Sequence, residues 1–152
     1  MRYSTAIAAL AAEAVGVMDT ALAMTVEYLK TRQQFGGPIA RFQALQHRAA
    51  EMLIALEQSR SMAMYAALML DEPNALERSK ALSAVKVQIG LAARFVGQQA
   101  IQLHGGIGVT DEYAVGHCHK RLAMMELQFG DTDHHLAEFA GAGGFISTEA
   151  IA

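Results

Sequence analysis

The chain has 152 residues, of which 53% are apolar and 18% charged, and its formal net charge at neutral pH is −3. This length predicts one domain, and the apolar fraction is ample for a core. The small negative net charge gives no reason to expect nucleic acid or an anionic membrane as a partner. The single cysteine, Cys118, cannot form an internal disulfide, so the composition favours a cytoplasmic location.

Alanine, leucine and methionine supply most of the apolar volume, which suits close-packed helices better than sheets. The first helix is predicted from about Ser4 to Lys30. Its charged residues leave no apolar stretch of the roughly 18 to 20 uncharged residues that a membrane span needs. This helix is apolar on several faces, so we expect the chain to self-associate. Its inward positions repeat at helical spacing: Ile7, Leu10, Ala14, Val15, Met18, Leu22, Val26 and Leu29.

The second helix is predicted from about Phe42 to Leu70, after a break at Gly36-Gly37-Pro38, where glycine permits a left-handed turn and proline cannot continue a helix. Its inward residues should be Leu45, Ala49, Met52, Leu56 and Met64.

The third helix is predicted from Ala75 to Leu103, with Asn74 as its cap. Its pattern buries Leu82, Val85, Ile89, Ala92 and Val96, and it leaves Lys80, Lys86 and Arg94 to solvent or to ligands.

Gly105-Gly106-Ile107-Gly108 ends the third helix. Thr110 is expected to cap a shorter helix that continues to about Glu126, and a last short helix should begin near Asp131 or Thr132. Four main helices joined by short connections predict an all-α fold, an antiparallel four-helix bundle.

Two short stretches lie at the ends of long helical patterns, where backbone and side chains can reach a ligand. They are Thr31-Arg32-Gln33-Gln34-Phe35-Gly36 and, about seventy residues later, Ile101-Gln102-Leu103-His104-Gly105-Gly106-Ile107-Gly108. A third, Phe129-Gly130-Asp131-Thr132, follows them. In this order and spacing they resemble the carboxyl-terminal helical domain of flavin-dependent acyl-CoA dehydrogenases.

The resemblance implies FAD as the cofactor and residues 1–152 as one helical domain of a longer protein. Family members carry two further domains upstream, one helical and one β-rich, which this sequence lacks. In the family the flavin ring lies between the β-rich domain and the helical bundle. One wall of the cofactor site would therefore come from segments outside this chain.

Carried over to this sequence, the family's arginine that reaches the flavin dinucleotide of an adjacent subunit is Arg32, with Gln34 and Phe35 beside it. A guanidinium can bind pyrophosphate through two hydrogen bonds, and an aromatic ring can contact the cofactor's rings. Gln43 matches a further glutamine that contacts the cofactor. Without the resemblance, Arg32 could merely complement the dipole at a helix end.

The resemblance assigns Gln102, Gly105 and Gly106 to the segment that receives the adenosine diphosphate part of FAD. Absent Cβ atoms at the two glycines would let the main chain approach phosphate closely. A glycine pair after a helix can also be only a cap. Thr132 matches a threonine beside the flavin, and His134 falls where the family often has glutamine.

Family members oxidise an acyl-CoA thioester: a carboxylate removes the α proton while the β hydrogen leaves as hydride to the flavin. The family usually presents Tyr-Glu-Gly-Thr, with the glutamate as base, where this chain has Gly130. A second family position for the glutamate falls at Ala6, which cannot act either. Asp131 is the nearest carboxylate, and it could be the base or only the cap of the last helix.

Two functions therefore stay open. The chain is either the domain of an acyl-CoA dehydrogenase with an unusual or absent base, or a non-catalytic subunit that completes the FAD site and the assembly of a glutamate-bearing partner. An Asp131 carboxylate aimed into the flavin cavity would favour the first, and one folded back onto backbone amides the second. The chain length and type of the acyl group are not encoded in these residues.

The resemblance implies acyl-CoA as substrate, a homo-oligomer (dimer or tetramer) or a homologous dehydrogenase subunit as partner, and electron-transferring flavoprotein as electron acceptor. No metal site is expected. His117-Cys118-His119 and His134-His135 are dense, but adjacent residues on a helix point to different faces.

Overall fold

The structure is a computed structural model and describes residues 2–144 of the chain. Its elements are, in order, α1 (Arg2–Thr31), β1 (Gln33–Gln34), β2 (Gly37–Pro38), the 3-10 helix η1 (Ile39–Arg41), α2 (Gln43–Met69), α3 (Ala75–His104), the 3-10 helix η2 (Gly105–Val109), α4 (Ala114–Leu127) and α5 (Thr132–Gly141).

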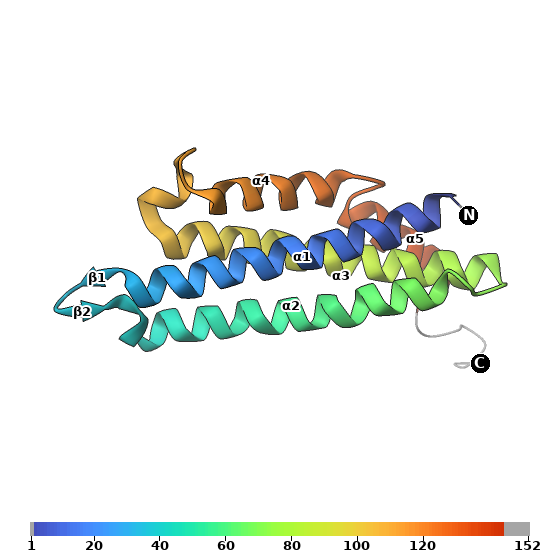
Figure 1. Cartoon of the computed structure of the whole chain (residues 1–152). Coiled ribbons are helices and arrows are strands. Elements are labelled where there is room, and N and C mark those ends of the chain that lie inside the picture. Colours follow the sequence, from blue (N-terminus) through green and yellow to red (C-terminus); the bar gives the residue numbers. More distant parts are fainter. Residues whose placement is uncertain (1, 145–152) are drawn as a thin grey trace.

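Helices α1, α2, α3 and α4 run antiparallel to their neighbours in the chain and form an elongated bundle (Figure 1). Helix α3 lies at its centre, because it contacts α1, α2, α4 and α5. The hairpin of β1 and β2 and the 3-10 helix η2 lie at one end of the bundle, and α5 lies toward the other (Figure 1). The prediction of an all-α, antiparallel four-helix bundle is confirmed, with α5 as a short addition.

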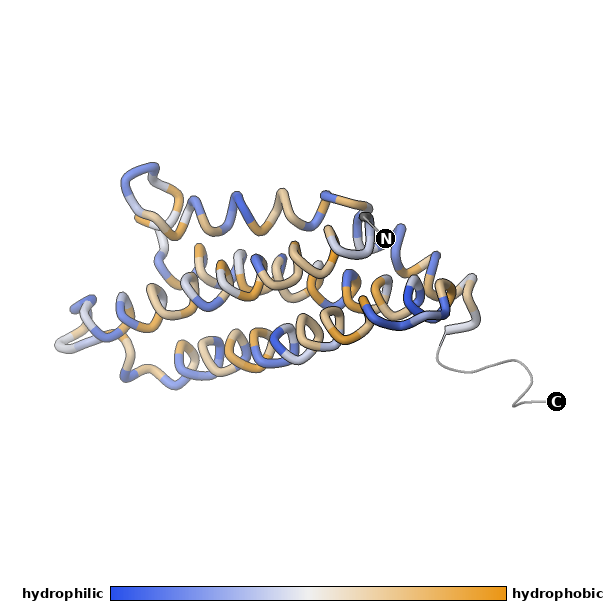
Figure 2. The backbone as a smooth tube through the Cα atoms, turned by 45° about the vertical axis from the view of Figure 1, so that its right-hand side comes forward, coloured by the Kyte–Doolittle hydropathy of each residue, from blue (hydrophilic) through white to orange (hydrophobic). Residues whose placement is uncertain are grey.

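The core is made by apolar stripes on α1 and α3, as the spacing predicted. Ile7, Met18, Val85 and Val96 are each at most 1% exposed. Along each helix, apolar and polar segments alternate at short intervals, as a helix with one covered face requires (Figure 2). Bundle packing therefore follows directly from the periodicity of these two helices.

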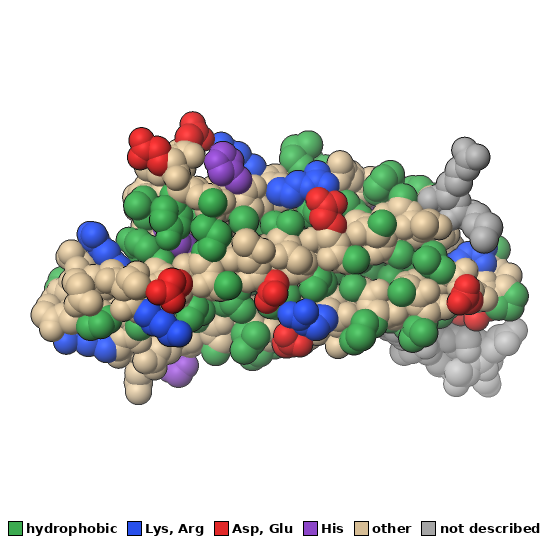
Figure 3. Space-filling model, in the orientation of Figure 1, with side chains coloured by type: hydrophobic (Ala, Val, Ile, Leu, Met, Phe, Trp, Pro, Cys, Tyr) green, Lys and Arg blue, Asp and Glu red, His purple; other side chains and the backbone are tan. Residues whose placement is uncertain are grey.

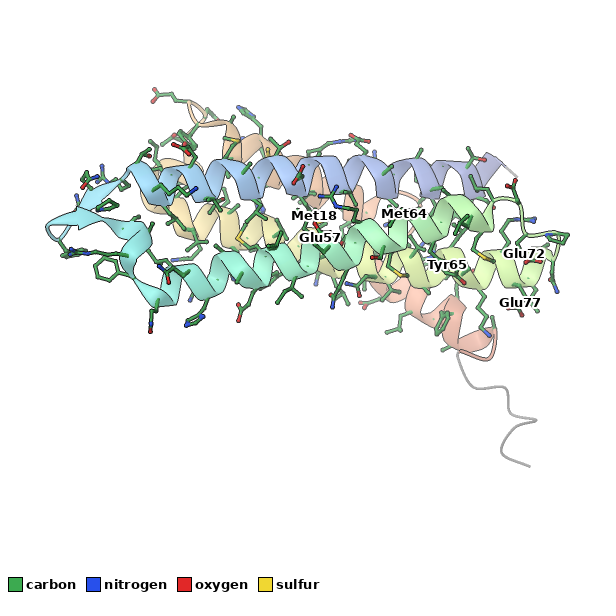
Figure 4. All side chains as sticks on the ribbon, turned by 60° about the horizontal axis from the view of Figure 1, so that its bottom comes forward. Met18, Glu57, Met64, Tyr65, Glu72 and Glu77 are labelled. Atoms are coloured by element: carbon green, nitrogen blue, oxygen red, sulfur yellow. The ribbon has the colours of Figure 1, made fainter. Side chains whose placement is uncertain are left out.

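Helix α2 buries only one stripe of its own surface. The prediction that Met64 faces inward is wrong. Met64 is 60% exposed, because α2 lies at the side of the bundle and packs mainly on α1 and α3. Met64 and its neighbour Tyr65 lie on the second half of α2 (Figure 4). The exposed apolar side chains of this helix are Leu53, Ile54, Met64, Tyr65 and Leu68.

Helix α1 is long and apolar enough, from Tyr3 to Thr31, to cross a membrane by length and composition alone. However, 44% of its most apolar window is buried in the bundle, where α1 packs on α2, α3 and α4. A helix in the core of a domain passes the same test of length and composition, so α1 is weak evidence for a membrane span, and a cytoplasmic location stays a prediction.

The helix caps were predicted in part. Asn74 caps α3 as expected, since its Oδ1 accepts hydrogen bonds from the backbone N–H groups of Leu76 at 2.9 Å and Glu77 at 3.4 Å. The cap predicted at Thr110 is wrong, because α4 begins only at Ala114. The Thr110 hydroxyl instead donates to the Ile107 carbonyl at 2.9 Å, within the 3-10 turn that continues from α3.

A glycine in the middle of α3 lets the turn between α4 and α5 approach closely. A Cβ atom on Gly90 would lie 2.3 Å from the Thr132 Oγ1 atom and 3.5 Å from the Glu126 side chain. Real Cβ contacts are essentially never so short. Because Gly90 has no side chain, the start of α5 can pack closely against α3 at this position.

We expect Gly90→Ala to destabilise the chain by about 1 to 3 kcal/mol, because Thr132 must move out of a packed contact. Gly16→Ala is the matched control, since no atom lies within 4 Å of a Cβ there. That control should stabilise α1 by roughly 0.5 to 1 kcal/mol, the ordinary gain of alanine over glycine in a helix. Urea unfolding measures both, and equal stabilisation by the two changes would contradict this account of α5.

Candidate functional site

Most of the predicted cofactor residues lie at the hairpin end of the bundle. Arg32, Gln34 and Phe35 follow the end of α1, and Gln43 is the first residue of α2. The carboxyl end of α3 reaches the same end of the bundle and adds Gln102, Gly105 and Gly106 (Figure 1). All seven are exposed, so their side chains and main chain are available to a ligand or a partner.

The hairpin holds Phe35 in a fixed position. Phe35 and Gly36 both have positive φ values, 53° and 83°, as the two central residues of a tight hairpin turn require. The Arg41 guanidinium donates to the Phe35 carbonyl, and the Phe35 ring meets the Phe42 ring edge to face at 5.9 Å. Phe35 is nevertheless 81% exposed. Sequence reasoning missed Arg41, because a bond to a main-chain carbonyl leaves no pattern in the sequence.

The glycine pair after α3 is partly a helix cap. Gly105 has φ of +64°, and its N–H bonds to the carbonyls of Ile101 and Gln102, as a glycine cap does. No atom of residues 2–144 lies within 4 Å of a Cβ placed on Gly105 or Gly106. Crowding within this chain does not require these glycines, and the open space beside them fits the approach of a phosphate-bearing cofactor.

Behind this turn lies a buried histidine that the sequence did not single out. His104 is 3% exposed, its Nδ1 bonds to the Ala100 carbonyl at 2.7 Å, and its ring stacks on Tyr28 at 4.6 Å. Its Nε2 is buried and has no hydrogen-bond partner among the described residues. Burial lowers the pKa of His104, and the bond to Ala100 opposes this only partly, so the ring is neutral with Nδ1 as donor.

The remaining predicted residues, Thr132 and His134, lie elsewhere. They belong to the turn between α4 and α5, which sits on α3 at Gly90. Gly90 and Gly105 are fifteen residues apart on α3, or about 22 Å along the helix axis. The predicted cofactor residues therefore form two groups, which lie beside different parts of α3, and not a single cluster.

Gly130, where the resemblance would place the family's glutamate, has a backbone conformation and surroundings that favour glycine. Its φ is +91°, and the preceding Phe129 has φ of +60°, a strained conformation for a residue with a Cβ atom. A Cβ on Gly130 would lie 2.5 Å from His134 Cδ2 and 3.0 Å from His135 Nε2. The positive φ and the two crowding histidines both favour glycine at position 130.

The carboxylates nearest to this position are engaged within the chain. Asp131 Oδ1 accepts the backbone N–H of His134 at 2.8 Å, which makes Asp131 the cap of α5. Glu126 is 9% exposed and accepts from Arg94 Nη2 and from the Thr132 N–H, both at 3.2 Å. The Thr132 hydroxyl is buried against Gly90 without a partner among the described residues.

Lys86 was predicted to face solvent or ligands, and this is wrong. It is 2% exposed, and its ammonium donates to the carbonyls of Met125 at 3.2 Å, Glu126 at 2.7 Å and Gly130 at 2.7 Å. The face of α3 that carries Lys86 is the one covered by the α4–α5 turn. Burial lowers the pKa of Lys86, and the nearby charges of Glu126 and Asp131 raise it.

His135 completes the support of this turn. Its Nε2 lies 2.7 Å from the Phe129 carbonyl and its Nδ1 3.1 Å from the Ser83 hydroxyl. A carbonyl only accepts, so Nε2 carries the proton and Nδ1 accepts from Ser83. Tyr3, in the first turn of α1, also donates to the Phe129 carbonyl at 2.6 Å. His135 is buried whereas the adjacent His134 is exposed, as expected for neighbours on a helix.

An apolar cavity of about 510 Å³ lies between α2, α3 and α5, lined among others by Met62, Val87, Leu136 and Phe139. It contains none of the predicted cofactor residues. Its walls are mostly hydrocarbon, so it offers packing surface and no chemistry.

Comparison with known proteins identifies the family of the chain. Residues 7–142 match the family described as acyl-CoA dehydrogenase, C-terminal domain. The chain therefore belongs to the acyl-CoA dehydrogenase family and corresponds to its carboxyl-terminal helical domain.

Two curated relatives are themselves named as acyl-CoA dehydrogenases. The chain is 35% identical over 124 residues to the probable acyl-CoA dehydrogenase YngJ of Bacillus subtilis, covering 82% of this chain and 32% of YngJ. It is 38% identical over 109 residues to acyl-CoA dehydrogenase IpdE2 of Mycobacterium tuberculosis, covering 72% of this chain and 32% of IpdE2. The chain thus spans about a third of the length of these curated relatives.

The fold is shared with solved structures. A variant of the Tcur3481-Tcur3483 steroid ACAD superposes with a TM-score of 0.87 at 30% identity, covering 98% of this chain and 40% of that one.

The two buried histidines predict a loss of stability in acid. Burial, the larger cause in each, lowers the pKa of His104 and of His135 below the ordinary 6.5. Below about pH 6.5 these histidines bind protons in the unfolded chain but stay neutral in the folded chain. The free energy of unfolding therefore falls by up to about 1.4 kcal/mol per pH unit for each histidine. The loss ends once the pH is below the folded pKa.

Urea unfolding between pH 7.5 and 5 measures this slope. His104→Phe keeps a ring between Tyr28 and Tyr113 and should flatten the slope, whereas the exposed His47, changed to Gln, serves as control and should leave it unchanged. A slope that is the same in all three proteins would show that the buried histidines are not its source.

Proposed function

We propose that this chain acts in the flavin-dependent α,β-dehydrogenation of an acyl-CoA thioester, as the helical domain that completes the FAD site and the subunit interface. The proton-abstracting base would come from a glutamate-bearing partner. The observation that carries this proposal is the turn at Gly130 and Asp131. Its glycine cannot carry a base, and its aspartate is folded back onto a backbone amide.

The chemistry requires a carboxylate within hydrogen-bonding reach of the α carbon. Gly130 and Ala6 have no such group, Asp131 caps α5, and Glu126 is held by Arg94 and the Thr132 N–H. Bound FAD would supply the acceptor for the β hydrogen as hydride. The described residues thus offer cofactor contacts and a rigid seat, and no carboxylate of this turn is free for proton abstraction.

Because the two groups of predicted cofactor residues lie apart, we expect them to contact different parts of the cofactor. At the hairpin end, Arg32 would bind the pyrophosphate of an adjacent subunit's cofactor, with Phe35 held beside it by Arg41. Gln34, Gln43, Gln102, Gly105 and Gly106 would contribute further contacts there.

At the α4–α5 turn, His134 and Thr132 would lie beside the flavin. The Thr132 hydroxyl faces α3, so the exposed His134 imidazole is the better placed of the two. Both contacts remain proposals.

Assembly is the second part of the proposal. The apolar faces of α1, from which self-association was expected, are packed on α2, α3 and α4. Among the exposed large apolar side chains, a group of five lies on α2: Leu53, Ile54, Met64, Tyr65 and Leu68. On the face shown in Figure 3, apolar and charged side chains alternate along α1 and α2, as a surface that meets a second subunit can do.

We propose a homo-oligomer, a dimer or tetramer, or pairing with a homologous dehydrogenase subunit. The two component names of the similar Tcur3481-Tcur3483 steroid ACAD support the second form. Electron-transferring flavoprotein is the proposed electron acceptor.

The isolated chain should bind FAD weakly or not at all, because residues 2–144 supply only one wall of the site. Mixed with a glutamate-bearing homologous subunit, it should retain stoichiometric FAD through dialysis, as visible absorbance measures. Arg32→Gln should reduce this retention, whereas Arg78→Gln, in the first turn of α3 and bonded to the Glu72 carbonyl, should not. Stoichiometric FAD on the isolated chain would contradict the proposed sharing of the site.

Asp131→Asn separates a cap from a base in the complete flavin-loaded assembly. Asparagine caps almost as well as aspartate, so stability should change by less than about 1 kcal/mol. Turnover should then change little, because the base lies elsewhere. A loss of about 10²-fold or more in turnover, with FAD content and melting temperature unchanged, would instead make Asp131 the base and the chain a self-sufficient dehydrogenase.

A further inference from the structure

We propose that Lys86 is a positioning residue that fixes the conformation of the turn from Met125 to Thr132, and through it the surface that this turn presents to the cofactor. The last clause rests on the proposed function. The role of Lys86 within the chain rests on the geometry alone.

One ammonium group joins both sides of the turn. The carbonyls of Met125 and Glu126 belong to the last turn of α4, where no further helical N–H reaches them, and the carbonyl of Gly130 lies just before α5. An ammonium has three donors, and all three are used here. Lys86 therefore ties the exit of one helix to the entry of the next.

The three acceptors are neutral carbonyls, although Glu126 and Asp131 are close enough for their charges to act on the ammonium. The Glu126 carboxylate is bonded to Arg94 and the Thr132 N–H, and the Asp131 carboxylate to the His134 N–H. The lysine charge is thus balanced by oriented main-chain dipoles. Burying an ammonium in this way is costly, and an apolar side chain of the same length would fill the space without that cost. However, an apolar side chain has no donors and could not orient the three carbonyls.

Orientation matters because the turn holds two residues in the left-handed region, Phe129 and Gly130. The Phe129 carbonyl is held by His135 Nε2 and the Tyr3 hydroxyl, and the Gly130 carbonyl by Lys86. In a planar trans peptide the N–H points opposite to the carbonyl. The N–H groups of Gly130 and Asp131 are therefore directed away from Lys86, Tyr3 and His135, toward the outer side of the turn.

Sequence context gave no hint of this role. Lys86 follows Val85 and precedes Ile89 in the buried stripe of α3, and charged residues in such a stripe are usually expected at its border. Only the contact with Gly130, forty-four residues later, reveals it.

Lys86→Met tests the inference in the full 152-residue chain, because methionine keeps the length of the side chain and removes the donors. Backbone hydrogen exchange should accelerate by about tenfold or more at Thr132 and His135, whose N–H groups are bonded to Glu126 Oε1 and to the Asp131 carbonyl. In α2, around Met52, it should change by less than about twofold. Lys80→Met, on the same helix but bonded to none of these carbonyls, is the matched control and should leave both regions unchanged.

An equal acceleration in α2 and α5 would overturn the inference, because Lys86 would then support only global stability. No acceleration at all would overturn it as well. If Lys86→Met does not fold, the unaltered chain still decides. NMR couplings between Lys86 Nζ and the carbonyl carbons of Glu126 and Gly130 should be detectable, and a freely exchanging ammonium without such couplings would refute the proposed role.

The link to the cofactor has its own measurement. In the flavin-loaded assembly, Lys86→Met should shift the visible absorbance of bound FAD and lower turnover, with KM for acyl-CoA unchanged. Local loosening of the turn without any change of the FAD spectrum would support the positioning role and count against the proposed function, so the two can fail separately.

Discussion

Helix α3 must pack against four other helices at once, and this constraint determines where the α4–α5 turn and the hairpin end of the bundle can lie. A helix surrounded on so many sides has room for only small residues or fully bonded polar groups where a neighbour crosses closely. Gly90 meets the first condition beneath Thr132, and Lys86 meets the second beneath Gly130. The two residues together fix the seat of the α4–α5 turn, while the end of the same helix at Gly105 fixes the other candidate region.

This shared helix also links the two candidate regions mechanically. The distance along α3 between Gly90 and Gly105 is set by helix geometry and cannot adjust to a ligand. A cofactor or a partner subunit that touches one region therefore finds the other in a fixed relation to it. Such rigidity is useful in a domain that would complete a site built mainly from other segments, because the domain has little ordering left to lose on assembly.

The fold could be read from the sequence because its signals are local. The apolar spacing of Leu82, Val85 and Ile89 and the cap at Asn74 depend only on neighbours in the chain, and the structure agrees with them. Lys86 and Met64 were misassigned because their environment is set by segments far away in sequence. The α4–α5 turn covers Lys86, whereas no helix among residues 2–144 covers the outer face of α2 at Met64. Arg41, His104 and His135 were missed for a related reason, since each bonds to a main-chain carbonyl and the sequence does not show where that carbonyl lies.

The α4–α5 turn is built around Gly130, where the resemblance would place the family's glutamate. The φ of Gly130 is +91°, which favours glycine, and a Cβ there would lie 2.5 Å from the His134 ring and 3.0 Å from the His135 ring. The strained Phe129 is held by Tyr3 and His135 from two different helices. Tyr3 on α1, Lys86 on α3 and His135 on α5 thus all bond to main-chain carbonyls of this one turn, so three helices together set its conformation.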